Sequence, residues 1–164
     1  MNVINDGIDD KLFQYIQKSI AETPYYQVLS ISLSRIGAGI AEVTVTSIVE
    51  HTNPLGLIHG GLIMSLADAA MGNAVRSLGI RGVTVDCSTA FLSPAALGEQ
   101  ITARGRVLKS GKSLIFAHAE RWAGEKLISS LLSSISFSPA HSSAVASIKL
   151  ILDFKTLVRA VICT

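Results

Sequence analysis

Residues 62–78 read LIMSLADAAMGNAVRSL, which is apolar or small on nearly every side of a helix until Arg76. A helix without a polar face belongs inside a protein, covered by other elements. The preceding residues 51–61, HTNPLGLIHGG, carry one proline and three glycines and break both helix and strand periodicity. Gly79 supplies a stop. The sequence therefore predicts a loop over 51–61 and a buried helix over 61–78.

Alternating apolar and polar residues predict strands on both sides of that helix. The expected strands are residues 29–33, 42–46, 83–92, 101–108, 113–122 and 126–137. Short turns at residues 93–98, 110–112 and 123–125 predict an antiparallel meander for the last four. A short amphipathic helix is expected over residues 9–20, capped by Asp9 or Asp10 and stopped by Pro24. The fold class is α+β, with a curved antiparallel sheet wrapped around one long buried helix.

Residues 1–138 are expected to form this single domain, and residues 139–164 an extension of it. The pattern of the extension is that of an amphipathic helix. Its apolar face would carry Leu150, Phe154, Leu157, Val158 and Val161.

The amino-acid composition indicates which partners and which compartment to expect. Hydrophobic residues make up 49% of the chain, charged residues 16%, and the mean hydropathy is +0.47. Surplus apolar surface of this kind usually lies in a subunit interface or a ligand site. The net charge of +2 is spread along the chain without a basic cluster, so nucleic acid is not an expected partner. Cys87 and Cys163 form no CxxC pair, which indicates free thiols in a reducing compartment.

The sequence also argues against other sites and locations. The first residues lack the basic start of a signal peptide, and no sustained apolar run is long enough to span a membrane, so we expect a cytoplasmic protein. The four histidines show no metal-ligand spacing, and neither a metal nor any other cofactor is expected. No serine lies in a GxSxG elbow.

Gly60 and Gly61 lie at the start of the long helix. Glycines at a helix start leave backbone N–H groups unobstructed at the positive end of the helix dipole. Such amides can hold an anion or stabilise the oxygen that becomes negative during acyl transfer. The alternative is that the two glycines only permit close packing of the helix on the sheet.

Asp68 lies inside the helix expected to be buried, with no Lys or Arg within one turn. An unpaired buried carboxylate costs several kcal/mol, so it must be hydrogen-bonded, protonated or useful. We interpret it as a general base or a nucleophile. The alternative is a structural carboxylate bonded to a backbone or hydroxyl group.

The spacing of these residues predicts an oligomer. Seven residues separate Gly61 from Asp68, roughly 10 Å of helix rise, whereas a base or nucleophile must come within about 3–3.5 Å of its target. Asp68 cannot easily act on a carbonyl held at the start of its own helix. Two antiparallel helices across a dimer would place Asp68 of one chain near Gly60 of the other. We therefore expect a homo-oligomer, a dimer or a tetramer, with shared sites.

Three blocks carry a family resemblance: HTNPLGLIHGGLIMSLADAAMG, GVTVDCSTAFLSPAALGE and RVLKSGKSLIFAHAE. They resemble the hotdog-fold acyl-CoA thioesterases of the phenylacetyl-CoA-thioesterase-like group, and most closely its cytosolic branch called thioesterase superfamily member 2. The resemblance covers about residues 28–130. It implies a hotdog fold and hydrolysis of an acyl-CoA thioester to a free acid and CoA.

The resemblance also implies roles for single residues. Asp68 corresponds to the catalytic carboxylate, and Gly60 to the residue whose amide faces the thioester oxygen. Asn53 corresponds to a loop side chain that positions substrate or water, His59 to its neighbour near the thioester, and Thr84 to a hydroxyl that helps hold the attacking water. Two segments, residues 91–96 and 109–114, match stretches that contact CoA. The residues implied for substrate binding are Phe91, Leu92, Ser93, Pro94, Lys109, Ser110, Gly111, Lys112 and Ser113.

Two other functions remain open on the same fold: a non-catalytic acyl-CoA sensor, and an acyl-CoA hydratase or dehydratase. The acid and histidine pair typical of the second is absent from the sequence, and a pure binder has no need of a base. The preferred acyl group depends on pocket shape, for which Met64, Met71 and Phe91 are the candidate residues.

Overall fold

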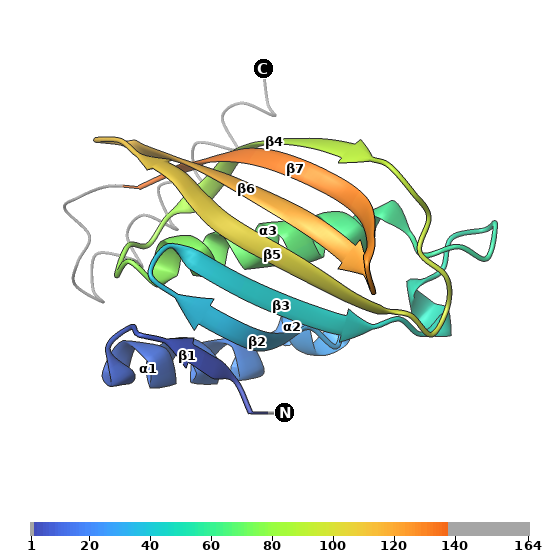
Figure 1. The fold of residues 1–164 in the computed structure, drawn as a ribbon, viewed down its shortest axis with the longest axis horizontal. Helices are drawn as coiled ribbons and strands as arrows, with labels where there is room; N and C mark the ends of the chain where they lie inside the picture. The colour runs from blue at the N-terminus through green and yellow to red at the C-terminus, as the bar shows by residue number, and fades with distance from the viewer. Residues whose placement is uncertain (1, 138–164) are drawn as a thin grey trace, which may run out of the picture.

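The computed structural model describes residues 2–137 and is built around one long helix. This helix, α3, runs from Gly60 to Arg76 and lies along the concave face of a seven-stranded sheet (Figure 1). The curved sheet around a long helix confirms the fold class that the sequence predicted. The extension expected over residues 139–164 lies outside the described residues.

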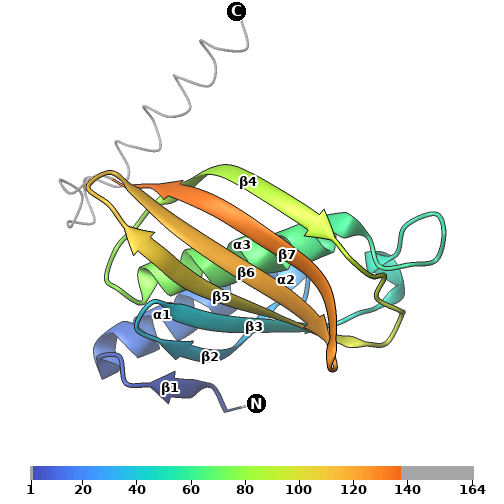
Figure 2. The ribbon, with the colours of Figure 1, turned by 45° about the horizontal axis from the view of Figure 1, so that its top comes forward.

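The strands follow the order β1-β2-β3-β5-β6-β7-β4 across the sheet. Their bounds are β1 Ile4–Asp6, β2 Ser32–Gly37, β3 Ile40–Thr46, β4 Val83–Phe91, β5 Gln100–Ser110, β6 Leu114–Ala123 and β7 Lys126–Ser136. All neighbouring pairs are antiparallel except β1 with β2. Figure 2 shows β4 at the edge opposite β1.

The meander predicted for the last four strands is only partly right. β5, β6 and β7 do follow one another, but β4 pairs with β7 at the edge of the sheet and β5 pairs with β3. The connection between β4 and β5 is too long to be a tight hairpin. The N–H groups of Leu92 and Ser93 donate to the carbonyl of Ile128 in β7, and Ala95 is buried. The segment therefore crosses the end of the sheet instead of reversing the chain.

The N-terminal part departs further from the prediction. Helix α1 runs from Asp10 to Glu22, with the Asp9 carboxylate accepting from the N–H groups of the first turn, so Asp9 is the cap. Helix α1 ends just before Pro24, as predicted, but Pro24 also opens a second short helix that was not predicted, α2 (Pro24–Val28). A proline fits the first turn of a helix, where its missing N–H has no role. The strand expected at residues 29–33 consequently begins later, at Ser32.

Close packing of α3 on the sheet depends on Gly105 in β5. A Cβ atom added there would lie 2.5 Å from the carbonyl carbon of Ala70 in α3. Around this contact, α3 side chains such as Leu66, Ala70 and Met71 are completely buried. Gly105, and not Gly60 or Gly61, is the glycine that lets the helix approach the strands.

One stripe of α3 is uncovered, contrary to the expectation that the helix is buried on nearly all sides. Gly61, Met64 and Asp68 are exposed along it, and Ser65 and Gly72 are partly exposed. Strand β4 is exposed as well, with Val83 and Val85 at 45% and 60% accessibility. The uncovered stripe and the edge strand are the surplus apolar surface that the composition indicated.

Candidate active site

The loop before α3 is shaped by the side chain of Asn53. Its Oδ1 accepts hydrogen bonds from the N–H groups of Leu55 (2.9 Å) and Leu57 (3.1 Å), and its own N–H donates to the Leu57 carbonyl at 2.7 Å. The side-chain oxygen of Asn53 is therefore used to hold the loop in this turn. The Nδ2 donor has no acceptor among the described residues and remains available to a ligand.

In the first turn of α3, one backbone amide is bonded to the N-cap side chain and another is unpaired. His59 is the N-cap, and its Nδ1 accepts from the Gly61 N–H at 2.8 Å. The Gly60 N–H has no acceptor in residues 2–137. An unpaired amide at the positive end of a helix attracts negative charge. Gly60 therefore offers the open donor, and His59 fixes the turn that presents it.

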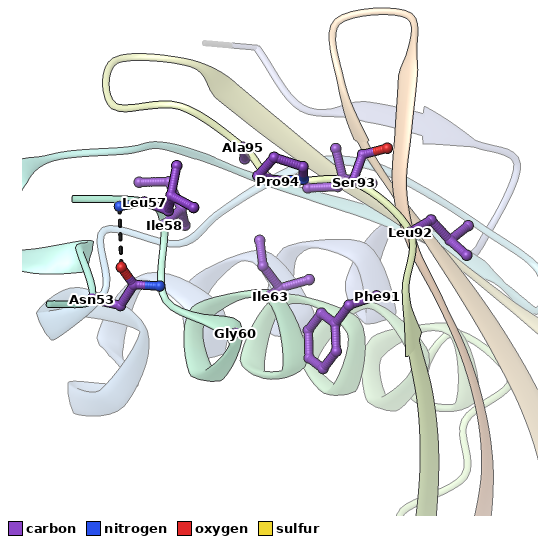
Figure 3. Close-up of a pocket in the computed structure, with 11 residues that line it drawn as sticks. Asn53, Leu57, Ile58, Gly60, Ile63, Phe91, Leu92, Ser93, Pro94 and Ala95 are labelled. Carbon is purple, nitrogen blue, oxygen red and sulfur yellow. Dashed lines mark hydrogen bonds between the residues drawn. The ribbon is translucent and has the colours of Figure 1, made fainter. Parts of the chain in front are cut away.

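A cavity of about 350 Å³ lies at this end of α3 (Figure 3). That size is within the usual range of small-ligand sites. Apolar side chains make up most of the wall, and Gly60, Asn53 and Ser93 supply the polar part. The lining residues are Asn53, Leu57, Ile58, Gly60, Ile63, Phe91, Leu92, Ser93, Pro94, Ala95 and Ile128.

Phe91 closes one side of this cavity over Gly60. A Cβ atom added at Gly60 would lie 3.1 Å from the Phe91 ring, and the ring is drawn beside the first turns of α3 in Figure 3. The nearest neighbour of Gly60 is thus a pocket side chain and not sheet backbone. This favours the role of Gly60 in the site over the packing alternative.

Several predicted residues meet in the cavity, and others do not. Asn53, Gly60 and the segment from Phe91 to Pro94 come together. The sequence reasoning missed Leu57, Ile58, Ile63 and Ile128, whereas Ala95 lies within the predicted segment 91–96. It was wrong about two methionines: Met71 is buried in the core, and Met64 is 41% exposed on the uncovered stripe of α3.

Asp68 and Thr84 form a second polar group. The Thr84 hydroxyl, from β4, donates to Asp68 Oδ1 at 2.6 Å. Asp68 is exposed, so the expected burial was wrong. Its carboxylate still acts on its surroundings: burial, and after it the charge of Asp68, raises the pKa of Tyr26.

The two polar groups are separated within one chain. Asp68 lies eight residues after Gly60 along α3, about 12 Å of helix rise. Asp68 and Thr84 do not line the cavity. Both groups nevertheless lie on the same uncovered side of the molecule, formed by α3 and β4.

The segment from Lys109 to Ser113 lies still farther away. It forms the end of β5 and the turn into β6, and all five residues are exposed. The Ser113 carbonyl accepts a hydrogen bond from the Phe137 N–H at 3.1 Å. Phe137 follows the last residue of β7, and that end of β7 pairs with the start of β4. Because the cavity lies at the other end of β4, one chain does not bring this segment to it.

His59 faces a different cavity, of about 310 Å³, together with His51, Tyr25 and Ser65. No three His, Cys, Asp or Glu side chains in residues 2–137 are grouped as metal ligands would be. Within the same residues, no helix is long and apolar enough to cross a membrane.

Comparisons with known proteins agree with this geometry. Residues 55–129 match the model of the thioesterase superfamily. Over 86 residues the chain is 41% identical to human acyl-coenzyme A thioesterase 13, an alignment that covers 51% of this chain and 60% of the relative. A putative esterase of Saccharolobus solfataricus is 30% identical over 97 residues, covering 58% of this chain and 69% of the relative.

A solved structure shares the fold. The PaaI protein of E. coli, from the phenylacetic acid degradation operon, superposes with a TM-score of 0.76 at 26% identity, covering 80% of this chain and 96% of PaaI. The hotdog arrangement is therefore common to both. The aligned part of the chain spans only about three fifths of the human relative's length, 60%.

Proposed function

This chain belongs to the thioesterase superfamily, and from that membership we propose that it hydrolyses acyl-CoA thioesters to a free acid and CoA. The human relative is named an acyl-coenzyme A thioesterase, which supports this substrate class. The observation that carries the proposal is the open Gly60 N–H on the wall of an apolar cavity.

In this proposal the acyl chain lies in the cavity and the thioester carbonyl points at Gly60. As water adds to the carbonyl carbon, the oxygen becomes negative, and the Gly60 amide and the α3 dipole stabilise it. The free Nδ2 of Asn53, on the same wall, supplies a second donor. Donors already in place before the reaction need not reorganise as the charge develops.

Asp68 supplies the proton acceptor. Thr84 holds Oδ1, so Oδ2 is free to take a proton from water. The hydroxide formed adds to the carbonyl carbon, the C–S bond breaks as the oxyanion collapses, and the CoA thiolate leaves and takes up a proton. Direct attack of Asp68 on the carbonyl, followed by hydrolysis of the anhydride, uses the same carboxylate.

The about 12 Å between Gly60 and Asp68 require a second subunit. We propose that two chains pack their uncovered α3 stripes against each other in opposite directions, so that Asp68 of one chain lies near Gly60 of the other. Edge strand β4 favours this pairing, since it presents unpaired backbone groups beside exposed Val83 and Val85.

The same pairing would bring the Lys109–Ser113 segment of one chain toward the cavity of the other. Its exposed lysines and hydroxyls suit the phosphates and amides of CoA. The free thiol of Cys87 fits a reducing compartment, which supports a cytoplasmic location.

The test is to incubate the purified protein with a panel of acyl-CoAs and a thiol-reactive dye. Hydrolysis releases the CoA thiol, so colour develops in proportion to protein. A hydratase changes the acyl chain without releasing CoA, and a sensor binds without changing it. Binding of acyl-CoA with no thiol release from any member of the panel would reject the proposal.

A further inference from the structure

Arg121 in β6 is a buried cation without an anion. Its side chain has 0% accessibility. Nη1 donates to the Ala119 carbonyl at 2.9 Å, Nη2 donates to Ser129 Oγ, and Nε has no partner. No ion pair within residues 2–137 involves it. A buried charge is normally paired, because removing it from water costs several kcal/mol.

The guanidinium remains charged under physiological conditions. Burial lowers the pKa of Arg121 to about 10, which is still well above neutral pH. The Ala119 carbonyl and the Ser129 hydroxyl are neutral, so neither balances the charge. The position therefore costs stability in the free protein, and a cost of this kind is typical of functional sites.

Arg121 lies on the inner face of the sheet, in line with the cavity. Its neighbours Ala117 and Ala119 on β6 pack with Ala67 and Met71 of α3, and Arg121 continues their alternation. Across the sheet Arg121 pairs with Ser129, and Ser129 pairs with Phe91. Two strand spacings, about 10 Å, thus separate Arg121 from the pocket-lining Phe91.

A hydrogen-bond relay connects the two positions. Ser129 Oγ accepts from Arg121 and donates to the Ala90 carbonyl at 2.8 Å, one residue before Phe91. Thr89, two residues before Phe91 on the same strand face, has a buried Oγ1 without a partner. The residues packed behind Phe91 therefore carry unpaired polar atoms, whereas the cavity itself is mostly apolar.

We propose that Arg121 binds a carboxylate at the far end of the acyl chain, so that the favoured substrates are CoA monothioesters of dicarboxylic acids. This rests on the proposed thioesterase function and names its substrate class. The chain enters through the apolar cavity beside Gly60, and its terminal carboxylate reaches the guanidinium behind Phe91. The Phe91 ring, 56% exposed in the single chain, must change rotamer for the carboxylate to pass.

The test compares two thioether analogues of acyl-CoA with equal chain length, one ending in a carboxylate and one in a methyl group. Neither analogue can be hydrolysed, so calorimetry measures binding alone. Wild-type protein is expected to favour the carboxylate analogue by roughly tenfold to a hundredfold at one chain length, the value of a charged hydrogen bond. Equal affinity across a series of lengths would overturn the inference.

Two variants test whether Arg121 causes the preference for the carboxylate analogue. Arg121→Met keeps an unbranched side chain and removes the charge, and it should abolish the preference while raising the melting temperature of the free protein. Arg106→Met changes an exposed arginine of β5 and should alter neither. A preference that survives Arg121→Met overturns the inference. The wild-type comparison decides the inference alone if Arg121→Met does not fold.

Hydrolysis assays separate this inference from the proposed function. If wild-type protein cleaves methyl-ended and carboxylate-ended acyl-CoAs equally well, the thioesterase proposal stands and the role of Arg121 fails. If the carboxylate analogue binds preferentially but no acyl-CoA is cleaved, the thioesterase proposal fails and recognition by Arg121 stands.

Discussion

At the scale of single residues, the bond from Thr84 to Asp68 Oδ1 leaves one carboxylate oxygen for chemistry. Asp68→Asn keeps an oxygen for Thr84 but can neither take a proton nor attack. We expect kcat to fall by about 10²–10⁴, the usual contribution of a general base. Because Asp68 is exposed in the single chain, the variant should stay folded. Steady-state kinetics, with circular dichroism and light scattering on the same sample, measures both.

Asp10→Asn is the matched control, since it makes the same chemical change at an exposed position of helix α1 that does not line the cavity. It should leave kcat unchanged. If Asp68 is instead a structural carboxylate, Asp68→Asn should lower stability, and activity would fall only in step with the folded fraction.

Local sequence was enough to predict some site residues but not others. Gly60 was predictable because a glycine helix start is a local pattern, whereas Asn53 was indicated only by the family resemblance. The exposure of Asp68 was not predictable. Small residues such as Gly61, Ser65 and Gly72 are usual in a buried helix, but here they lie on the uncovered stripe. The burial of Arg121 was not predicted, although the alternation of Ala117 and Ala119 places Arg121 on the inner face of β6.

At the scale of elements, the contact between α3 and β5 depends on Gly105. In Gly105→Ala the new Cβ atom would meet the backbone of Ala70 at 2.5 Å, and backbone cannot move aside as a side chain can. We expect a loss of roughly 1–3 kcal/mol or more in the free energy of unfolding. Urea denaturation measures it through the transition midpoint.

Gly72→Ala provides the comparison within α3. A Cβ atom at Gly72 meets nothing within 4 Å, and alanine is favoured over glycine inside a helix by roughly 0.5–1 kcal/mol. Its midpoint should fall less than that of Gly105→Ala, since the new methyl group meets nothing within the chain and could contact only a second subunit on the uncovered stripe. Equal midpoints for Gly105→Ala and wild type would mean that the helix and strand do not pack as closely as described.

The turn between β5 and β6 carries a prediction about CoA. Lys112 is exposed and distant from the cavity of its own chain, so its proposed contact is with CoA bound to the partner subunit. The CoA part does not change during hydrolysis, so Lys112→Ala should raise KM more than it lowers kcat. Lys11→Ala, on helix α1, is the control and should change neither constant. An unchanged KM for Lys112→Ala would make Lys112 an ordinary solvated residue.

The order of elements was predictable only where connections are short. The two-residue turn between β6 and β7 forces those strands to pair, and the prediction was right there. Residues 92–99 are long enough to cross the end of the sheet, and no local pattern shows that β4 lies beside β7. The three residues of β1 are too few to show an alternation.

At the scale of the whole molecule, one chain contains every part of the proposed site but in separate places. The uncovered α3 stripe, the β4 edge and the exposed ring of Phe91 form one side that a second copy would cover. We therefore expect an obligate dimer, which can assemble further. Light scattering at assay concentration tests this, and an active monomer would contradict it.

A hybrid dimer tests whether the site is shared. Asp68→Asn removes the base from one chain, and Gly60→Val in the other places a branched side chain against the Phe91 ring and blocks the cavity. Each variant alone should be nearly inactive. In a hybrid dimer, one site would combine Asp68 from the Gly60→Val chain with Gly60 from the Asp68→Asn chain, and the other site would carry both changes. Co-expression with two different affinity tags isolates the hybrid, which should recover up to half of the wild-type activity because one of its two sites is intact.

A mixture of the two separately purified variants, kept from exchanging subunits, is the control and should stay inactive. An inactive hybrid with verified composition would mean that Asp68 and Gly60 do not act across the interface, and the about 12 Å between them would then have to be closed by a change within one chain.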